Sequence, residues 1–132
     1  ATIDYDALKD ADAIFICVPT PFDAMRAPDL SFIISAAEGI APRLKRGQMI
    51  VLQSTTYPGT TQEIVQPILE RAGLKAGVDF DIAFSPERID PGRTDYTIRT
   101  TPKVVGGLTE ECTEAAASLY GEICDELARE RY

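Results

Sequence analysis

The sequence predicts an α/β fold in three layers, with a mostly parallel sheet between helices. Three observations lead to this prediction. Short apolar runs alternate with segments in which apolar residues recur at helical spacing. The first three runs each end in a polar or proline-rich tip rather than in a tight hairpin turn. The run at residues 49–52 has no polar break, which is typical of a strand buried on both faces of a sheet.

Residues 49–59 form the stretch around which the other elements are arranged. The apolar run leads into three hydroxyl side chains and then into the turn sequence Tyr57-Pro58-Gly59. Thr60, with Glu63 three residues later, is a capping-box pattern that opens a helix, and Pro67 predicts a bend in that helix. The hydroxyl groups either only cap the helix or face a ligand beyond the strand ends. The pattern alone leaves both interpretations open.

The chain before this stretch predicts a helical turn, a strand and a helix. Residues 4–10 are weakly amphipathic, and residues 11–18 form a second buried-strand candidate. Pro19-Thr20-Pro21 ends that strand, because prolines lack the N–H that a sheet ladder needs. Asp29 can cap the next helix, and Pro42 predicts a kink or an early end. The apolar residues of that helix are Phe32, Ile33, Ala36, Ala37, Ile40 and Leu44.

The chain after it predicts two more strands and a last helix. Residues 80–84 form the third strand, which ends in the polar tip Ser85-Pro86-Glu87-Arg88. A polar loop leads to a short fourth strand at residues 103–107. Thr109 is placed to cap the last helix. Its expected apolar stripe is Cys112, Ala116, Leu119, Ile123 and Leu127.

Composition and charge fit an ordinary globular domain. The chain has 132 residues, of which 45% are hydrophobic and 26% charged. No apolar run approaches the roughly 20 residues that span a bilayer, and the first residues show no signal segment, so we expect a cytoplasmic protein with no membrane partner. The formal net charge is −8, and −5 of it lies after Leu108. We interpret most of these acidic residues as the solvent-exposed face of one helix. This acidity argues against nucleic acid as a partner.

The absence of histidine limits the chemistry that this chain can supply. It excludes Ser-His and Cys-His nucleophile pairs within the chain, so a general base here must be a carboxylate, Lys, Tyr or Cys. The cysteines Cys17, Cys112 and Cys124 lack metal-ligand spacing, and we expect no metal site. Because Cys17 lies inside an apolar run, we expect it to be a buried free thiol.

The strand tips are expected to meet. Right-handed crossovers would bring Thr20, Thr55 and Glu87 to one edge of the sheet, beyond the carboxyl ends of the strands. Each residue alone is more often structural: Thr20 a turn residue, Thr55 a cap and Glu87 a solvated carboxylate. Together they could hold a small polar ligand.

Four segments stand in a specific order: I-C-V-P-T-P-F at 16–22, Q-S-T-T-Y-P-G-T-T at 53–61, S-P-E-R-I-D-P-G at 85–92 and P-K-V-V-G-G at 102–107. Together they resemble the amino-terminal domain of the nucleotide-sugar dehydrogenases, the UDP-glucose/GDP-mannose dehydrogenase family. They are most similar to its UDP-N-acetylglucosamine 6-dehydrogenase branch. The UDP-glucose branch more often has a Phe-Leu pair where Arg88-Ile89 stand here.

The resemblance implies an NAD-dependent enzyme of polysaccharide biosynthesis, acting in its full-length form as a homodimer. Its substrate would be a UDP-hexose or UDP-N-acetylhexosamine, whose C6 alcohol is oxidised in two steps to the carboxylate through a cysteine thioester. By position, the NAD site would include Val18, Pro19, Thr20, Pro21, Ser54 and Thr55. Glu87 would be the catalytic acid/base, with Thr55 helping to hold the hydrolytic water. The sugar would be bordered by Glu87, Arg88, Ile89, Asp90 and Pro91.

The chain also departs from the family. The family opens its domain with a G-x-G-x-x-G turn that cradles the pyrophosphate, and the nine glycines here do not form one. The family's catalytic cysteine lies in a later domain. We therefore expect residues 1–132 to be a single domain, the second half of a Rossmann-like NAD-binding domain, and to be inactive alone. The alternatives are a UDP-glucose 6-dehydrogenase specifically, or a non-catalytic α/β assembly module.

Overall fold

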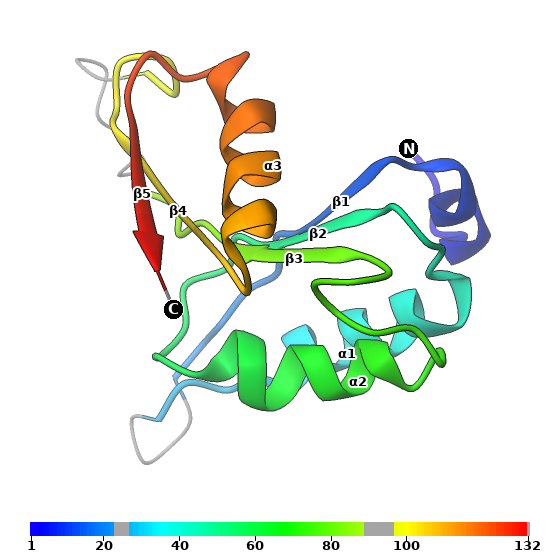
Figure 1. Ribbon diagram of the computed structural model, residues 1–132. Helices are drawn as coiled ribbons and strands as arrows, with labels where there is room; N and C mark the ends of the chain where they lie inside the picture. Colours follow the sequence, from blue (N-terminus) through cyan, green and yellow to red (C-terminus); the bar gives the residue numbers. More distant parts are fainter. Residues whose placement is uncertain (23–26, 89–96, 132) are drawn as a thin grey trace.

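A five-stranded sheet forms the centre of the computed structural model, which describes residues 1–22, 27–88 and 97–131. The strands are β1 (Ala13–Ile16), β2 (Met49–Leu52), β3 (Asp81–Phe84), β4 (Lys103–Gly107) and β5 (Leu127–Arg131). They lie side by side in chain order, with β1 at one edge (Figure 1). β1, β2 and β3 are parallel, β4 runs antiparallel to β3, and β5 is parallel to β4. The predicted mostly parallel sheet is therefore confirmed.

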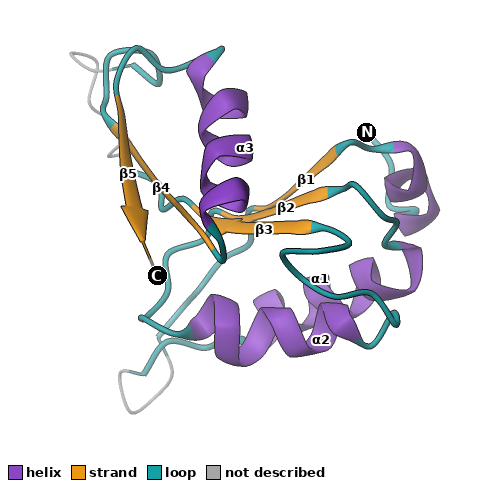
Figure 2. Cartoon of the chain, viewed as in Figure 1, coloured by secondary structure: helices purple, strands orange, loops and turns teal. Residues whose placement is uncertain are grey.

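Helices cover both faces of this sheet, which gives the predicted three layers. The helical segments are the 3₁₀ turns η1 (Tyr5–Asp10) and η2 (Ala41–Arg43), the π-helical turn η3 (Thr61–Val65), and the α-helices α1 (Ser31–Ile40), α2 (Gln66–Glu70) and α3 (Glu110–Gly121). α1 and α2 lie together on one face of β1–β3, whereas α3 lies on the other (Figures 1 and 2). Within the described residues, no helix is long and apolar enough to span a membrane.

Strand β2 is buried on both faces, as its uninterrupted apolar run predicts. Ile50 and Leu52 belong to the core against α1 and α2. Met49 and Val51 point the other way and belong to a second, smaller core against α3. Successive side chains of a strand alternate between faces, so four apolar residues in a row are needed to serve both cores.

The helix before β2 begins and ends close to the predicted points. The carboxylate of Asp29 accepts a hydrogen bond from Ser31 N at 2.9 Å, and this bond lowers the pKa of Asp29. Regular helix stops at Ile40, and the segment containing Pro42 continues as one 3₁₀ turn. Phe32 is 48% exposed, because the helix turns its other side, with Ile33 and Ala37, toward the sheet.

The predicted capping box after β2 does not form. Thr60 already has helical backbone angles, and its hydroxyl donates to Tyr57 O at 2.9 Å instead of capping the helix. The bend expected at Pro67 appears as the π-helical turn directly before α2. Proline offers no N–H and its ring crowds the carbonyl four residues earlier, and a wider turn relieves both effects.

The last helix is shorter than the sequence pattern predicts. Thr109 caps it by accepting from Cys112 N at 3.2 Å, but the helix ends at Gly121. Ile123 is 47% exposed, and Leu127 begins a fifth strand that was not predicted. The spacing of these apolar residues also suits a turn followed by a strand. Pairing with β4 satisfies the backbone of this segment, whereas a longer helix would leave the edge of β4 open.

Candidate active-site edge

The tips of β1 and β2 are tied together by Ser54. Its hydroxyl accepts from Val18 N and donates to Val18 O, both at 2.8 Å, and the residue is 6% exposed. The backbone N–H groups of Gln53 and Ser54 donate to Ile16 O at 3.0 and 3.2 Å. The structure thus brings two predicted cofactor residues, Val18 and Ser54, into direct contact, and it gives Ser54 a clear structural task as well.

The other predicted cofactor residues lie on the same edge. Pro19 and Pro21 are exposed and Thr20 is half-buried, all directly after β1. Thr55 is exposed, one residue beyond Ser54. These positions agree with a binding edge at the carboxyl ends of the parallel strands.

Glu87 is held at the tip of β3 by groups from two other elements. Gln53 Nε2 donates to Glu87 Oε2 at 3.0 Å, and Lys103 Nζ lies 3.6 Å from the same oxygen. Tyr120 of α3 donates its hydroxyl to Gln53 Oε1 at 3.0 Å, which fixes the direction of the Gln53 amide. The Glu87 side chain is 41% exposed. Glu87 is therefore an oriented carboxylate within reach of solvent.

A small pocket of about 100 Å³ adjoins this carboxylate. Phe15 and Tyr120 line it, in edge-to-face contact with ring centres 5.8 Å apart, together with Gln53, Glu87 and Lys103. Burial raises the pKa of Tyr120 to about 12, so its hydroxyl stays protonated at neutral pH and acts as a donor. The pocket combines an apolar wall with the Glu87 carboxylate, the Lys103 ammonium group and the Arg88 guanidinium group.

Cys17 is exposed, which corrects the prediction of a buried thiol. β1 is the edge strand of the sheet, and the face of this segment that carries Phe15 and Cys17 is only partly covered by other residues. Partial burial still raises the pKa of the Cys17 thiol. Cys112 and Cys124 are buried. A raised pKa is the opposite of what marks a reactive thiolate, so Cys17 is not an activated nucleophile here.

The predicted sugar-binding residues are only partly described. Arg88 is exposed, and its backbone N–H donates to Glu87 Oε1 at 2.8 Å. Ile89, Asp90 and Pro91 lie outside the described residues. Gln53, Lys103 and Tyr120 were not predicted as site residues. Gln53 and Lys103 lie inside two of the recognised segments, but their role depends on strand direction, which those segments do not reveal.

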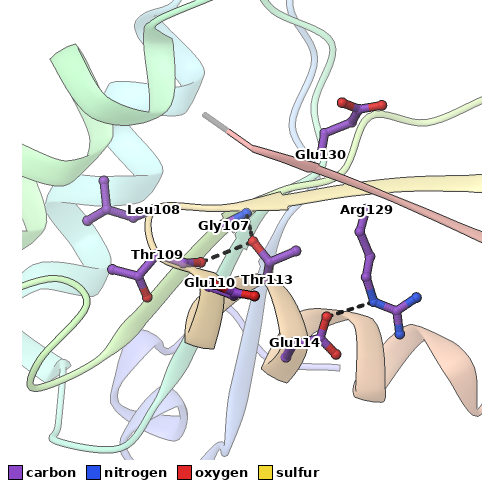
Figure 3. Close-up of a pocket in the computed structure, with 8 residues that line it drawn as sticks. All are labelled: Gly107, Leu108, Thr109, Glu110, Thr113, Glu114, Arg129 and Glu130. Carbon is purple, nitrogen blue, oxygen red and sulfur yellow. Dashed lines mark hydrogen bonds and ion pairs between the residues drawn. The ribbon is translucent and has the colours of Figure 1, made fainter.

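A larger pocket, of about 410 Å³, lies away from the strand tips (Figure 3). It surrounds the start of α3 and the end of β4, which runs opposite to β3. Polar groups in it pair with each other: Thr113 Oγ1 accepts from Gly107 N at 2.9 Å, and Arg129 forms an ion pair with Glu114 at 2.8 Å. The described part of the chain also holds no cluster of three or more side chains suited to a metal ion. We therefore take the strand tips as the candidate site.

The chain is similar to known dehydrogenases. Residues 1–124 match the model of the UDP-glucose/GDP-mannose dehydrogenase family, NAD binding domain. The UDP-N-acetyl-D-glucosamine 6-dehydrogenase of Pseudomonas aeruginosa is 39% identical over 123 residues, which are 92% of this chain and 29% of that protein. The UDP-N-acetyl-D-mannosamine dehydrogenase of Yersinia pestis is 40% identical over 119 residues, 83% of this chain and 28% of that protein.

A solved structure shows the same arrangement. The UDP-D-ManNAc dehydrogenase of Pyrococcus horikoshii superposes with a TM-score of 0.91 at 32% identity, over 98% of this chain and 31% of that one. The chain thus spans less than a third of the length of the proteins it matches. Its fold is that of a Rossmann-like dehydrogenase, and NAD is the cofactor of this domain type. The chain belongs to the UDP-glucose/GDP-mannose dehydrogenase family, in the part that forms the NAD-binding domain.

Proposed function

We propose that this chain supplies the Glu87-bearing wall of the active site in an NAD-dependent UDP-sugar 6-dehydrogenase. The observation that supports it most is the oriented, solvent-accessible carboxylate of Glu87 at a strand tip, next to the predicted cofactor edge. The reaction would oxidise the C6 alcohol of a UDP-sugar to a carboxylate in two steps. A full-length protein, as a homodimer in the cytoplasm, would carry the complete site.

The substrate we favour is a UDP-N-acetylhexosamine. The three relatives described above are named for UDP-N-acetylglucosamine or UDP-N-acetylmannosamine. The sequence S-P-E-R-I-D at residues 85–90 supports the same branch by resemblance. UDP-glucose remains the second candidate substrate.

The residues at the strand tips fit one side of an NAD site. The edge after β1 offers Thr20 between two prolines, and Pro19 and Pro21 lack the N–H groups that would extend the sheet ladder there. Val18, Thr20, Ser54 and Thr55 would hold this part of the cofactor. The glycine turn that grips the pyrophosphate in such folds is not among the 132 residues, so the isolated chain should neither bind NAD usefully nor be active. When bound, NAD would supply the oxidising power by accepting hydride from C6.

Glu87 would act as the general base in the second half of the reaction. Its carboxylate would take a proton from the water that hydrolyses a cysteine thioester, and Thr55 would help to orient this water. Gln53 would keep Glu87 Oε2 in place through its amide N–H. The cysteine itself would come from another part of the protein, because Cys112 and Cys124 are buried and burial raises the pKa of Cys17.

The test is a Glu87→Gln variant of a full-length dehydrogenase that contains this sequence. The amide keeps the size of the side chain but removes the base, so turnover should fall about 10²–10⁴-fold. Intact-protein mass spectrometry during turnover should show a covalent sugar adduct while the early burst of NADH persists. Thr55→Ala should give a smaller loss of the same kind.

Glu122→Gln is the matched control, because Glu122 is exposed after α3 and its loss should leave turnover unchanged. A near-normal rate for Glu87→Gln would show that Glu87 is only a solvated carboxylate. Loss of rate without burst or adduct would place its role outside hydrolysis.

A further inference from the structure

The reversal of β4 brings Lys103 back to the tip of β3. In the antiparallel pairing, Ala83 lies opposite Gly107 and Phe84 opposite Gly106. Continued past the end of β3, this register places Val104 opposite Pro86 and Lys103 opposite Glu87. Ser85 Oγ donates to Val104 O at 2.7 Å, which keeps the two segments together beyond the ladder. A parallel β4 would have carried Lys103 to the other end of the sheet.

Lys103 is buried, although it carries a charge. Its side chain is 9% exposed, and its ammonium group donates to Pro86 O at 3.2 Å. It also lies 3.6 Å from Glu87 Oε2 and 5.4 Å from the centre of the Tyr120 ring. A buried ammonium group is costly unless it is paired, and in this set Glu87 provides the negative charge.

We propose that Lys103 is a positioning residue for Glu87. From β4, the Lys103 ammonium group holds the Glu87 carboxylate at the strand tip and keeps it ionised, so that it can accept a proton. Gln53, directly after β2, holds the same carboxylate oxygen. The two side chains differ in exposure, because Glu87 is partly exposed to solvent whereas Lys103 is almost completely buried. The proposal deepens the function proposed above and rests on it for the meaning of Glu87, but the Lys103–Glu87 coupling can be measured without any activity.

The charge at this tip comes from identifiable groups. Tyr120, from α3, stays neutral because burial raises its pKa to about 12, and Cys17, after β1, stays neutral because burial raises its pKa as well. Arg88 contributes a second cation, but its side chain is exposed and therefore screened by water. Lys103 from β4 is the buried cation facing Glu87 among the described residues.

The experiment is an NMR titration of the Glu87 carboxyl carbon in this chain, assigned with Glu87→Gln. Lys103→Met removes the cation, so the Glu87 titration midpoint should rise by about half a unit to one unit. Lys103→Arg should restore most of the original midpoint. Lys75→Met is the matched control, because Lys75 is an exposed lysine that precedes β3. It therefore lies near the amino end of β3, whereas Glu87 follows the carboxyl end. A rise no larger than in this control would overturn the proposal.

A reciprocal measurement covers the case in which Lys103→Met fails to fold. The two side chains face each other at 3.6 Å, so Glu87→Gln should shift the NMR signal of the Lys103 ammonium group at neutral pH. Because Glu87 is partly exposed, its replacement spares the core. An unmoved Lys103 in that variant would overturn the proposal independently.

Activity provides the second readout, in a full-length dehydrogenase that contains this sequence. Lys103→Met should lower kcat, leave KM for NAD unchanged and move the acidic limb of the pH–rate profile to higher pH. If the NMR coupling is present but Glu87→Gln turns over normally, the proposed function fails and the positioning contact stands. If turnover depends on Glu87 but the NMR coupling is absent, the positioning role fails alone.

Discussion

The two halves of this sheet are built for different tasks. The parallel half, β1–β3 with α1 and α2, closes around an aliphatic core that includes Ile33, Ile50 and Leu69. The other half consists of β4, α3 and β5, and we call it the reversed half because β4 runs antiparallel to β3. It closes around a smaller core that includes Tyr120 and Cys124, and β4 begins with the buried Lys103. The parallel half provides a scaffold and three strand tips. The reversed half sends side chains back to one of those tips and orients Glu87.

The largest expected difference between the halves is in stability. Ile33 is fully buried in the aliphatic core, so Ile33→Ala should lower the free energy of unfolding by about 3–4 kcal/mol. Ile123, which the sequence pattern places on the same kind of stripe, is 47% exposed, and Ile123→Ala should cost about 0.5 kcal/mol or less. Urea denaturation of both variants measures the two values. Similar costs would mean that α3 continues past Gly121 after all.

The second difference concerns how closely the backbone approaches itself in the reversed half. A Cβ on Gly107 would lie 2.4 Å from Thr113 N, so Gly107→Ala must push α3 away from β4 and should cost about 2–3 kcal/mol. Gly47, before β2, has φ +82° and open space around its missing Cβ. Gly47→Ala should therefore cost only about 1 kcal/mol, from backbone strain alone.

Hydrogen exchange should separate these two glycine variants. In Gly107→Ala the amides of α3 should lose protection while those of α1 keep it, because the clash lies between α3 and β4. Uniform loss of protection across both helices would show that the halves unfold as one unit and would break the comparison.

The sequence predicts the parallel half well, for a physical reason. A strand buried on both faces must be apolar at every position, so residues 49–52 coincide with β2. Residues 80–84 contain β3, which begins at the partly buried Asp81. Two of the polar tips follow because parallel strands need long crossovers, which leaves Thr20 and Thr55 at strand ends. Glu87 lies at the end of β3, before the loop to the antiparallel β4. The predicted edge therefore lies where expected, although the roles of its residues stay predictions.

The reversed half was predicted less well, because its key properties are not local. Nothing in Lys-Val-Val-Gly-Gly encodes whether the strand runs parallel or antiparallel to its neighbour, and this direction alone decides whether Lys103 reaches Glu87. Leu127 fits a helix stripe and a strand equally, so the choice depends on the free edge of β4. The apolar run around Cys17 predicts burial, but it does not reveal that its strand lies at the edge of the sheet, where Cys17 is exposed.

The smallest effect concerns Tyr120, which joins the reversed half to Gln53. Burial raises its pKa to about 12 in the folded chain, from 10.0 when exposed. Between these two pH values the folded state holds a proton that the unfolded state has released. The contribution of this tyrosine to the free energy of unfolding is therefore fully present below about pH 10 and is lost as the pH rises toward about 12.

Tyr120→Phe removes the titrating group and also the hydrogen bond to Gln53, which should cost about 1 kcal/mol of stability at pH 8. The stability deficit of Tyr120→Phe relative to the parent chain should then narrow as the pH rises through this window. Urea denaturation at several pH values measures this deficit. A constant deficit for Tyr120→Phe would mean that its hydroxyl is as open to water in the folded chain as in the unfolded one, and that the reversed half does not close over the site.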